Sequence, residues 1–355
     1  MKDRSNQNMS QSLLKPELVR HALIHIHQKV VRTPVRTSPR LSDLASTLRL
    51  SWDDTKLDLL PRISLYFKCE NYQETGSFKY RGVLHALGQL PLRKLSKGLI
   101  ATSSGNHATA LACGARSISK ELGLDIPVFV VMPHSASDLK AEKAASFGAR
   151  VIRSGNSWAE REAAVDSLRL AHGLTTIASS DNEHVILGHG TVGLEMVEQV
   201  RDDFGVNLDC VILPCGGGGL LSGVGVALSE EPIQVFGAEP QDGADDGLRG
   251  LMALERVEEV TSATIADGLR CPLGNLAWQV IKKSSHVSGM FSVSDADICS
   301  TMQLVEETLG MVIEPSAAVS LAVVLFNKTF RTSAARQKRT MHVGVVFSGG
   351  NFSKG

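Results

Sequence analysis

The sequence lacks several features that would assign the chain to other classes of protein. Aromatic residues are only 5% of its 355 residues and the formal net charge is zero, so nothing indicates a nucleic-acid partner or an acidic membrane. Its six cysteines form no C-x-x-C pair, which favours reduced thiols. No apolar run reaches the length of a membrane span, and the first residues carry no apolar signal segment. We therefore expect a cytoplasmic protein without a membrane partner.

The two common glycine-rich nucleotide motifs are also missing. The run Gly216–Gly219 does not have the spacing G-x-G-x-x-G, and G-x-x-x-x-G-K-[ST] does not occur. The sequence therefore disfavours a dinucleotide-dependent oxidoreductase and a P-loop enzyme. Hydrophobic residues make up 43% of the chain and charged residues 21%, which is typical of a globular protein with one large domain or two of ordinary size.

Short apolar runs alternate with longer amphipathic stretches. The runs are nearly continuous, which is typical of strands buried on both faces of a parallel sheet. We expect strands at 63–68, 98–102, 128–132, 150–153, 208–213, 233–238 and 341–347, and helices at 107–122, 136–147, 157–172 and 192–204. This order predicts an α/β fold with mainly parallel sheets. We expect the polar segment 46–62 to be a surface insertion.

Glycine or hydroxyl residues gather at three places where an expected strand ends: 102–107, 214–219 and 347–351. In open α/β sheets, ligands bind at the carboxyl ends of the strands. The three clusters are therefore expected to share one ligand site. The tetraglycine run Gly216–Gly219 precedes an apolar helix, and bare backbone N–H groups at a helix N-terminus can hold a phosphate.

Lys79 stands in an unusual setting for a lysine. Gly76 and Gly82 permit close approach of the backbone, and Ser77 can cap a helix that begins near Phe78. A lysine in the first turn of a helix lies near the positive end of the dipole, which favours the neutral amine that a Schiff base needs. Lys79, the polar loop 103–107 and the tetraglycine together predict a site for pyridoxal 5'-phosphate (PLP).

Over about residues 33–352 the sequence resembles the fold-type II PLP enzymes, in the branch of serine racemase and serine/threonine dehydratase. The motifs that carry the resemblance are Gly76-Ser77-Phe78-Lys79-x-Arg81-Gly82, Ser103-Ser104-Gly105-Asn106-His107, Val131-Met132-Pro133, the tetraglycine, Glu239-Pro240, Ala266-Asp267-Gly268, Ile313-Glu314-Pro315 and Ser348-Gly349-Gly350-Asn351. It implies the fold of the tryptophan synthase β subunit, with two open, twisted, mainly parallel sheets flanked by helices. It also implies a large PLP-binding domain of residues 1–97 and 176–355, a small domain of residues 98–175, and a homodimer.

The resemblance implies roles for the residues of these motifs. Lys79 would form the Schiff base and move the proton at the substrate Cα. The cofactor-binding residues would be Phe78, Lys79, Asn106, Gly216, Gly217, Gly218, Gly219 and Ser348. The substrate would be bound by Ser103, Asn106, His107 and Arg161. For Phe78 a plain core role stays open, and for Arg161 a surface position is an equal alternative.

Two further roles follow from the resemblance. Ser104 matches the second base of serine racemase, on the face opposite the lysine, although a loop-capping serine stays open. Glu239, Gly243 and Asp245 match a divalent-cation site, for which two carboxylates, a carbonyl and waters would suit Mg²⁺ or Ca²⁺. An acidic surface loop is the alternative there.

The preferred function is β-elimination from a hydroxy amino acid such as L-serine, L-threonine or 3-hydroxyaspartate, giving a 2-oxo acid and ammonia. Ser348 would face the pyridine nitrogen of PLP, and a neutral hydroxyl makes the ring a weaker electron sink than a carboxylate would. Among reactions at Cα, elimination of a group from Cβ is slowed least by the weaker sink, because the negative charge leaves with that group. The runner-up is racemisation by Lys79 and Ser104.

A PLP-binding sensor without turnover is disfavoured because Lys79 and Ser348 are both present. Cys271 departs from the Ser or Thr of relatives, which leaves the substrate open.

Overall fold

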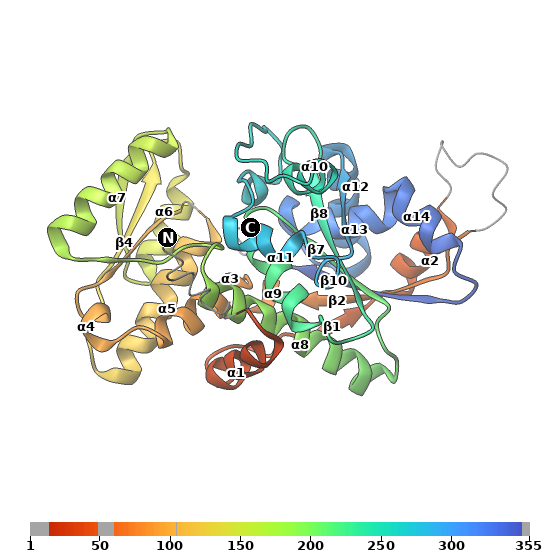
Figure 1. Cartoon of the computed structure of the whole chain (residues 1–355), viewed down its shortest axis with the longest axis horizontal. Helices are drawn as coiled ribbons and strands as arrows, with labels where there is room; N and C mark the ends of the chain where they lie inside the picture. The colour runs from red at the N-terminus through yellow and green to blue at the C-terminus, as the bar shows by residue number, and fades with distance from the viewer. Residues whose placement is uncertain (1–13, 49–59, 104, 350–355) are drawn as a thin grey trace, which may run out of the picture.

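The computed structural model describes residues 14–48, 60–103 and 105–349. The chain forms two lobes, each built around one sheet (Figure 1). The larger sheet has the order β1 (Val35–Thr37), β2 (Ile63–Cys69), β10 (Met341–Phe347), β7 (Cys210–Pro214), β8 (Gln234–Pro240) and β9 (Gly289–Val293). Only β1 runs antiparallel to its neighbour. The smaller sheet is all parallel, in the order β5 (Arg150–Ser154), β4 (Val128–Pro133), β3 (Leu99–Thr102) and β6 (Thr175–Thr176).

The α/β fold with two mainly parallel sheets is confirmed, and the seven expected strands are present with ends shifted by up to two residues. The sequence missed β1, β6 and β9, the first two of which have only three and two residues. The smaller sheet is built from residues 99–176, but the division into two domains stays a prediction. Most of the expected insertion 46–62 lies outside the described residues. No described helix is long and apolar enough to cross a membrane.

One expected helix begins much earlier than its apolar pattern suggested. Helix α8 spans Glu183–Phe204 rather than 192–204, and the Asn182 side chain caps it by accepting the N–H of Val185 at 3.1 Å. The added turns contain Gly188 and Gly190, which bring neighbouring backbones close. A Cβ on Gly190 would lie 2.5 Å from the carbonyl oxygen of Gly223. These glycines therefore serve helix packing rather than a helix end.

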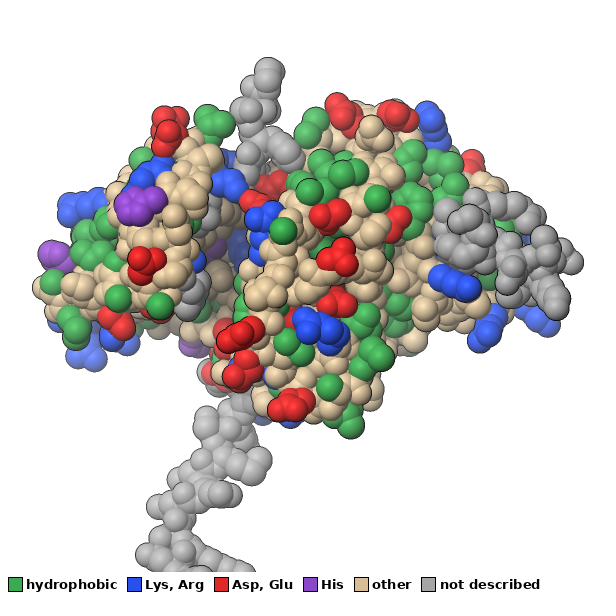
Figure 2. Space-filling model, turned by 90° about the horizontal axis from the view of Figure 1, so that it is seen from above, with side chains coloured by type: hydrophobic (Ala, Val, Ile, Leu, Met, Phe, Trp, Pro, Cys, Tyr) green, Lys and Arg blue, Asp and Glu red, His purple; other side chains and the backbone are tan. Residues whose placement is uncertain are grey.

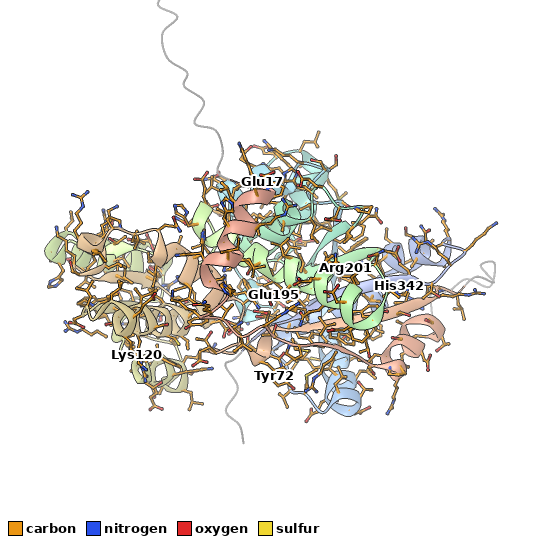
Figure 3. All side chains as sticks on the ribbon, turned by 90° about the horizontal axis from the view of Figure 1, so that it is seen from below. Glu17, Tyr72, Lys120, Glu195, Arg201 and His342 are labelled. Carbon is orange, nitrogen blue, oxygen red and sulfur yellow. The ribbon has the colours of Figure 1, made fainter. Side chains whose placement is uncertain are left out.

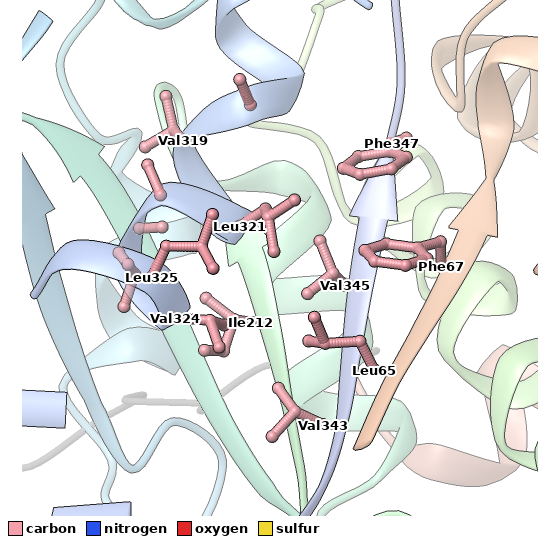
Figure 4. Close-up of a cluster of buried hydrophobic side chains, with 14 of the residues drawn as sticks. Leu65, Phe67, Ile212, Val319, Leu321, Val324, Leu325, Val343, Val345 and Phe347 are labelled. Atoms are coloured by element: carbon pink, nitrogen blue, oxygen red, sulfur yellow. The ribbon is translucent and has the colours of Figure 1, made fainter. Parts of the chain in front are cut away.

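Both faces of the larger sheet are buried. Ile212, Val343 and Phe347 point to one face, and the intervening Val211 and Val346 point to the other. The rings of Phe67 and Phe347 stack across β2 and β10 with their centroids 4.9 Å apart (Figure 4). The first face packs on α2 (Pro39–Thr47), α12 (Asp295–Leu309), α13 (Pro315–Phe326) and α14 (Lys328–Ala335). The second packs on α1 (Pro16–Ile26), α8, α9 (Gly219–Ala227) and α11 (Asn275–Ile281).

The smaller sheet is covered in the same way. Its strands pack on one side against α3 (Lys79–Gly88), α4 (Leu92–Leu95), α5 (Asn106–Leu122) and α6 (Asp138–Ser146). The other side packs against α7 (Trp158–His172), through Ile100, Phe129, Val131 and Val165. Helix α3 also packs on α8, which belongs to the larger lobe. It therefore joins the two sheets.

A buried group of four charged side chains fixes α3 against the larger sheet. Arg81 donates to both oxygens of Glu70 at 2.8 Å, and to the two oxygens of Glu195 at 2.9 and 2.8 Å. Lys68 donates to Glu195, to the carbonyl of Thr33 and to Gln199, at 2.7–2.8 Å. Figure 3 shows Glu195 near the middle of the molecule. Because each cation is paired and hydrogen-bonded, the group tolerates burial that would otherwise be costly.

Replacing Arg81 by methionine should destabilise the protein strongly. Buried Glu70 would lose its cation and buried Glu195 would keep only Lys68, so we expect the free energy of unfolding to fall by about 3–5 kcal/mol. Urea denaturation measures it. The control is Arg20→Met at the exposed Arg20–Glu230 pair, whose N···O distance is 3.1 Å. That change should cost less than about 1 kcal/mol. Equal losses for the two variants would show that the buried group does not hold α3.

Candidate active site

A cavity of about 230 Å³ lies between the two lobes, at the carboxyl ends of their strands. Figure 2 views this side and shows a furrow between the lobes, with charged side chains along its edges. Ser103 follows β3, Gly216 follows β7 by two residues and Ser348 follows β10, and all three line the cavity. Parallel strands bring their carboxyl ends to one edge of a sheet, which explains why the three predicted clusters meet.

Lys79 opens helix α3 and reaches into the cavity. Its amine donates to the carbonyl of Ser179 at 2.7 Å and lies 5.0 Å from the centre of the Phe78 ring. Burial lowers the pKa of this amine from 10.5 to about 8, while the nearby Cys271 acts weakly in the opposite direction. At pH 7 about a tenth of the amine is then neutral, which is several hundred times the fraction for an ordinary lysine. Lys79 is thus suited to nucleophilic and proton-transfer chemistry.

The tetraglycine loop leaves no room for side chains. A Cβ on Gly216 would lie 2.9 Å from the Cα of Leu269, and one on Gly217 would lie 2.4 Å from the Oγ of Ser180. Gly218 has a φ of 80°, which favours glycine. The N–H groups of Gly216 and Gly218 find no acceptor among the described residues. Helix α9 begins at Gly219, so these free donors and the helix dipole form an anion site.

The polar loop on the other side of the cavity is held by specific contacts. Asn106 begins α5, and its Nδ2 donates to both oxygens of Glu314, at 3.3 and 3.1 Å. His107 contacts the carbonyl of Ile177 through Nε2 at 2.9 Å. Burial, and then the charge of Lys79, lower the pKa of His107 to about 4, so the ring is neutral. Nε2–H therefore donates to Ile177, and the buried Nδ1 has no protein partner among the described residues.

Ser348 lies at the end of β10, where its hydroxyl accepts the N–H of Phe78 at 3.1 Å. Phe78 packs edge-on against His189, with ring centres 4.8 Å apart. His189 lies behind the glycine loop; both its ring nitrogens are buried without a hydrogen-bond partner among the described residues. Burial, followed by the charge of Lys79, holds the pKa of His189 well below its usual range. Sequence analysis assigned no role to this histidine.

Most of the predicted site residues meet in this one cavity. Those that line it are Phe78, Lys79, Ser103, Asn106, His107, Gly216, Gly217, Gly218, Gly219 and Ser348. Ser77 also lines it, but its hydroxyl does not cap α3 as the sequence suggested. Arg161 does not line it: its guanidinium donates to the carbonyl of Asn156 at 2.6 Å. Ser104, Gly350 and Asn351 lie outside the described residues, so the role of Ser104 stays a prediction.

The cavity also contains residues to which sequence reasoning gave no role. Lys140, Asp267, Glu314 and Ser316 line it, as does Cys271 beside the glycine loop. Asp267 and Glu314 stand in motifs that carried the resemblance, so their positions could have been suspected. Lys140 lies in an ordinary amphipathic helix and had no such signal.

The predicted cation residues lie together outside the cavity. Glu239 is the penultimate residue of β8 and accepts the N–H groups of Gly247 and Leu248 at 2.9 Å, at the start of α10 (Asp246–Ala253). Asp245 pairs with Arg249 at 2.9 Å. Among the described residues no group of three or more His, Cys, Asp or Glu side chains is arranged to hold a metal.

Comparison with known proteins agrees with this geometry. Residues 27–349 match the family described as pyridoxal-phosphate dependent enzyme. A serine racemase from Dictyostelium discoideum is 36% identical over 94% of this chain and 93% of its own length. A β-hydroxyaspartate dehydratase from Paracoccus denitrificans is 36% identical over 94% of both chains. The structure of maize serine racemase superposes with a TM-score of 0.84 at 33% identity, covering 96% of this chain and 94% of that one. The chain belongs to the PLP-dependent enzyme family.

The residues present fit PLP. The free N–H groups of the glycine loop suit its phosphate, and the Lys79 amine with its lowered pKa suits its aldehyde. The glycines keep the cradle open where side chains would fill it. Phe78 and Ser348 line the cavity beside Lys79, where a ring would fit. Free N–H donors, a buried amine and an aromatic side chain thus lie in one cavity, which is the set of groups that the cofactor would need.

The lowered pKa of Lys79 can be tested without turnover. We expect acetylation of Lys79 by acetic anhydride, in the cofactor-free protein, to rise with pH through a midpoint near 8, because only the neutral amine reacts. Mass spectrometry of the Lys79 peptide measures the extent of reaction, with the exposed Lys94 as the reference. A midpoint near 10.5 would contradict the predicted effect of burial.

Proposed function

We propose that this PLP-dependent enzyme dehydrates and deaminates a β-hydroxy amino acid, such as L-serine, L-threonine or 3-hydroxyaspartate, to a 2-oxo acid and ammonia. The observation that carries the proposal is the Lys79 amine, which lines the cavity between the N-termini of α5 and α9 with a pKa of about 8. The relatives named β-hydroxyaspartate dehydratase and L-threo-3-hydroxyaspartate ammonia-lyase support it.

Each part of the cavity has a task in binding. The N–H groups of Gly216–Gly219 would hold the cofactor phosphate, Lys79 would hold its aldehyde carbon, and Phe78 and Asn106 would contact its ring. Ser103, Asn106 and His107 would receive the substrate carboxylate at the N-terminus of α5, where the dipole favours an anion. His107 is neutral, so its ring adds no second fixed cation beside this carboxylate.

The chain supplies the proton transfers and the orientation. When bound, PLP withdraws electrons from the bonds to the substrate Cα. The neutral Lys79 amine removes the Cα proton, and the Cβ hydroxyl leaves with its bonding electron pair and a proton. Release and hydrolysis then give the 2-oxo acid and ammonia. Ser348 carries no charge, so charge that develops at Cα is best relieved by departure of the group at Cβ.

Racemisation is the second candidate. It needs a base on each face of Cα, and Lys79 and Ser104 would supply them. The serine racemases of Dictyostelium discoideum and Arabidopsis thaliana, at 36% and 32% identity, favour it. The measured D-isomer decides between the two reactions.

Further proposals rest on the resemblance. We propose a cytoplasmic homodimer with a small domain of residues 98–175, and Arg161 as a substrate-recognition residue reached by movement of α7. We also propose a Mg²⁺ or Ca²⁺ site at Glu239, the carbonyl of Gly243 and Asp245. The buried Oδ1 of the neighbouring Asp246, which has no partner among the described residues, supports an additional ligand there.

The proposed reaction is tested by a product assay of the PLP-loaded enzyme on L-serine, L-threonine and L-threo-3-hydroxyaspartate, reading 2-oxo acid and D-isomer together. We expect 2-oxo acid with little D-isomer. Lys79→Ala should lower turnover by at least about 100-fold, because it removes the base. The matched control is Lys94→Ala, at an exposed lysine. Turnover that survives Lys79→Ala would refute the mechanism, and dominant D-isomer would establish the racemase.

The cation site is tested by thermal unfolding. A cation that binds only the folded protein raises the melting temperature, and we expect Mg²⁺ or Ca²⁺ to raise it by about 5 °C over the EDTA-treated protein. Asp245→Asn should abolish this response, whereas Asp43→Asn, at an acidic residue in α2, should keep it. A response that is the same in the Asp245 variant would place the cation elsewhere.

A further inference from the structure

An ion pair joins the two lobes across the cavity. Lys140 lies in α6, which packs on the smaller sheet, and Asp267 begins the short helix η2 (Asp267–Leu269), which contacts α13 of the larger lobe. The Lys140 Nζ lies 2.6 Å from the Asp267 Oδ2, and both residues line the cavity. Their side chains are 27% and 45% exposed, so the pair is reachable from solvent. A ligand that enters the cavity therefore meets this pair.

Lys140 differs from the other charged residues that line the cavity because it is a cation with no role in binding the cofactor. The lining lysines and arginines are Lys79 and Lys140, and the lining carboxylates are Asp267 and Glu314. Lys79 has its task with the cofactor, and the sites proposed for the phosphate and the α-carboxylate are helix N-termini with neutral side chains. Among the described lining residues, Lys140 is thus the cation available to a further anionic group on a substrate.

A second carboxylate on the substrate would need such a partner. A carboxylate that leaves water for a half-closed cavity loses solvation, and an adjacent ammonium compensates for the loss. Glu314 and Asp267 would otherwise repel it. A hydroxy amino acid with an uncharged side chain makes no such demand. The side-chain charge of the substrate therefore decides whether Lys140 is needed.

Resting on the function proposed above, we propose that Lys140 selects substrates with a second carboxylate, of the 3-hydroxyaspartate class, by binding that carboxylate in place of Asp267. When no such substrate is bound, Asp267 forms the ion pair with Lys140. This contact links α6 to η2. The exchange leaves the Asp267 carboxylate, which is 45% exposed, to be solvated by water.

The test compares L-threo-3-hydroxyaspartate with L-serine in the PLP-loaded enzyme. Lys140→Met should lower the ratio of kcat/KM for 3-hydroxyaspartate to that for serine by about 30-fold or more, because the second carboxylate is then left in the cavity without a cation to pair with. Lys140→Arg should recover part of the ratio. Asp267→Asn should raise the ratio by a few fold, about 3-fold or more, because Lys140 loses its internal competitor. The control is Lys97→Met, an exposed lysine that does not line the cavity, which should leave the ratio as it is.

A binding experiment separates this inference from the proposed reaction. Succinate and butyrate have four carbons each but differ by one carboxylate, and their affinities for the same variants are measured by titration calorimetry. Lys140→Met should weaken succinate by about 30-fold more than butyrate, whether or not any substrate turns over. If turnover is absent but this difference holds, the proposed function fails and the subsite stands. Equal effects on both ligands, or no effect on either, would overturn the role of Lys140.

Discussion

The buried pairing of Arg81 with Glu70 and Glu195 is the interaction on which the site depends. Arg81 lies two residues after Lys79, in the first turn of α3, and it is fully buried. Its guanidinium pairs with Glu70, directly after β2, and with Glu195 on α8. It thereby links α3 to the end of β2 and to α8. Lys68 completes the group by donating to Glu195. The first turn of α3, and with it the backbone of Lys79, is thereby fixed relative to the larger sheet.

With α3 in place, the cavity acquires its electrostatic character from backbone more than from side chains. Helices α5 and α9 both point their N-termini into it, and the loop before α9 contributes free N–H groups. His107 is kept neutral by burial, and Ser348 is neutral by nature. Lys79, with a pKa of about 8, changes its protonation near neutral pH, which is what a catalytic base requires.

The two lobes meet at the cavity through side chains from both. Asn106 of the smaller lobe donates to Glu314 of the larger, and Lys140 pairs with Asp267. These contacts are polar and partly exposed, in contrast to the buried charges around Arg81. Replacing one partner of a polar contact by a ligand group costs less free energy than breaking apolar packing, because a ligand with the same chemistry can take the place of that partner. The polar contacts between the two lobes are thus the part of the site that a substrate can alter.

The sequence by itself determined the α/β class and the seven main strands, and it singled out Lys79 and the tetraglycine loop that line the cavity, because near-continuous apolar runs and glycine clusters are local signals. It did not reveal the start of α8, whose glycines resemble breaks until the helices that approach them are known. Only the tertiary structure decided that Lys140 and Asp267, 127 residues apart, face each other across the cavity, and that Arg161 binds its own loop. Such pairings depend on how two sheets are placed against one another, and no local pattern of residues encodes that placement.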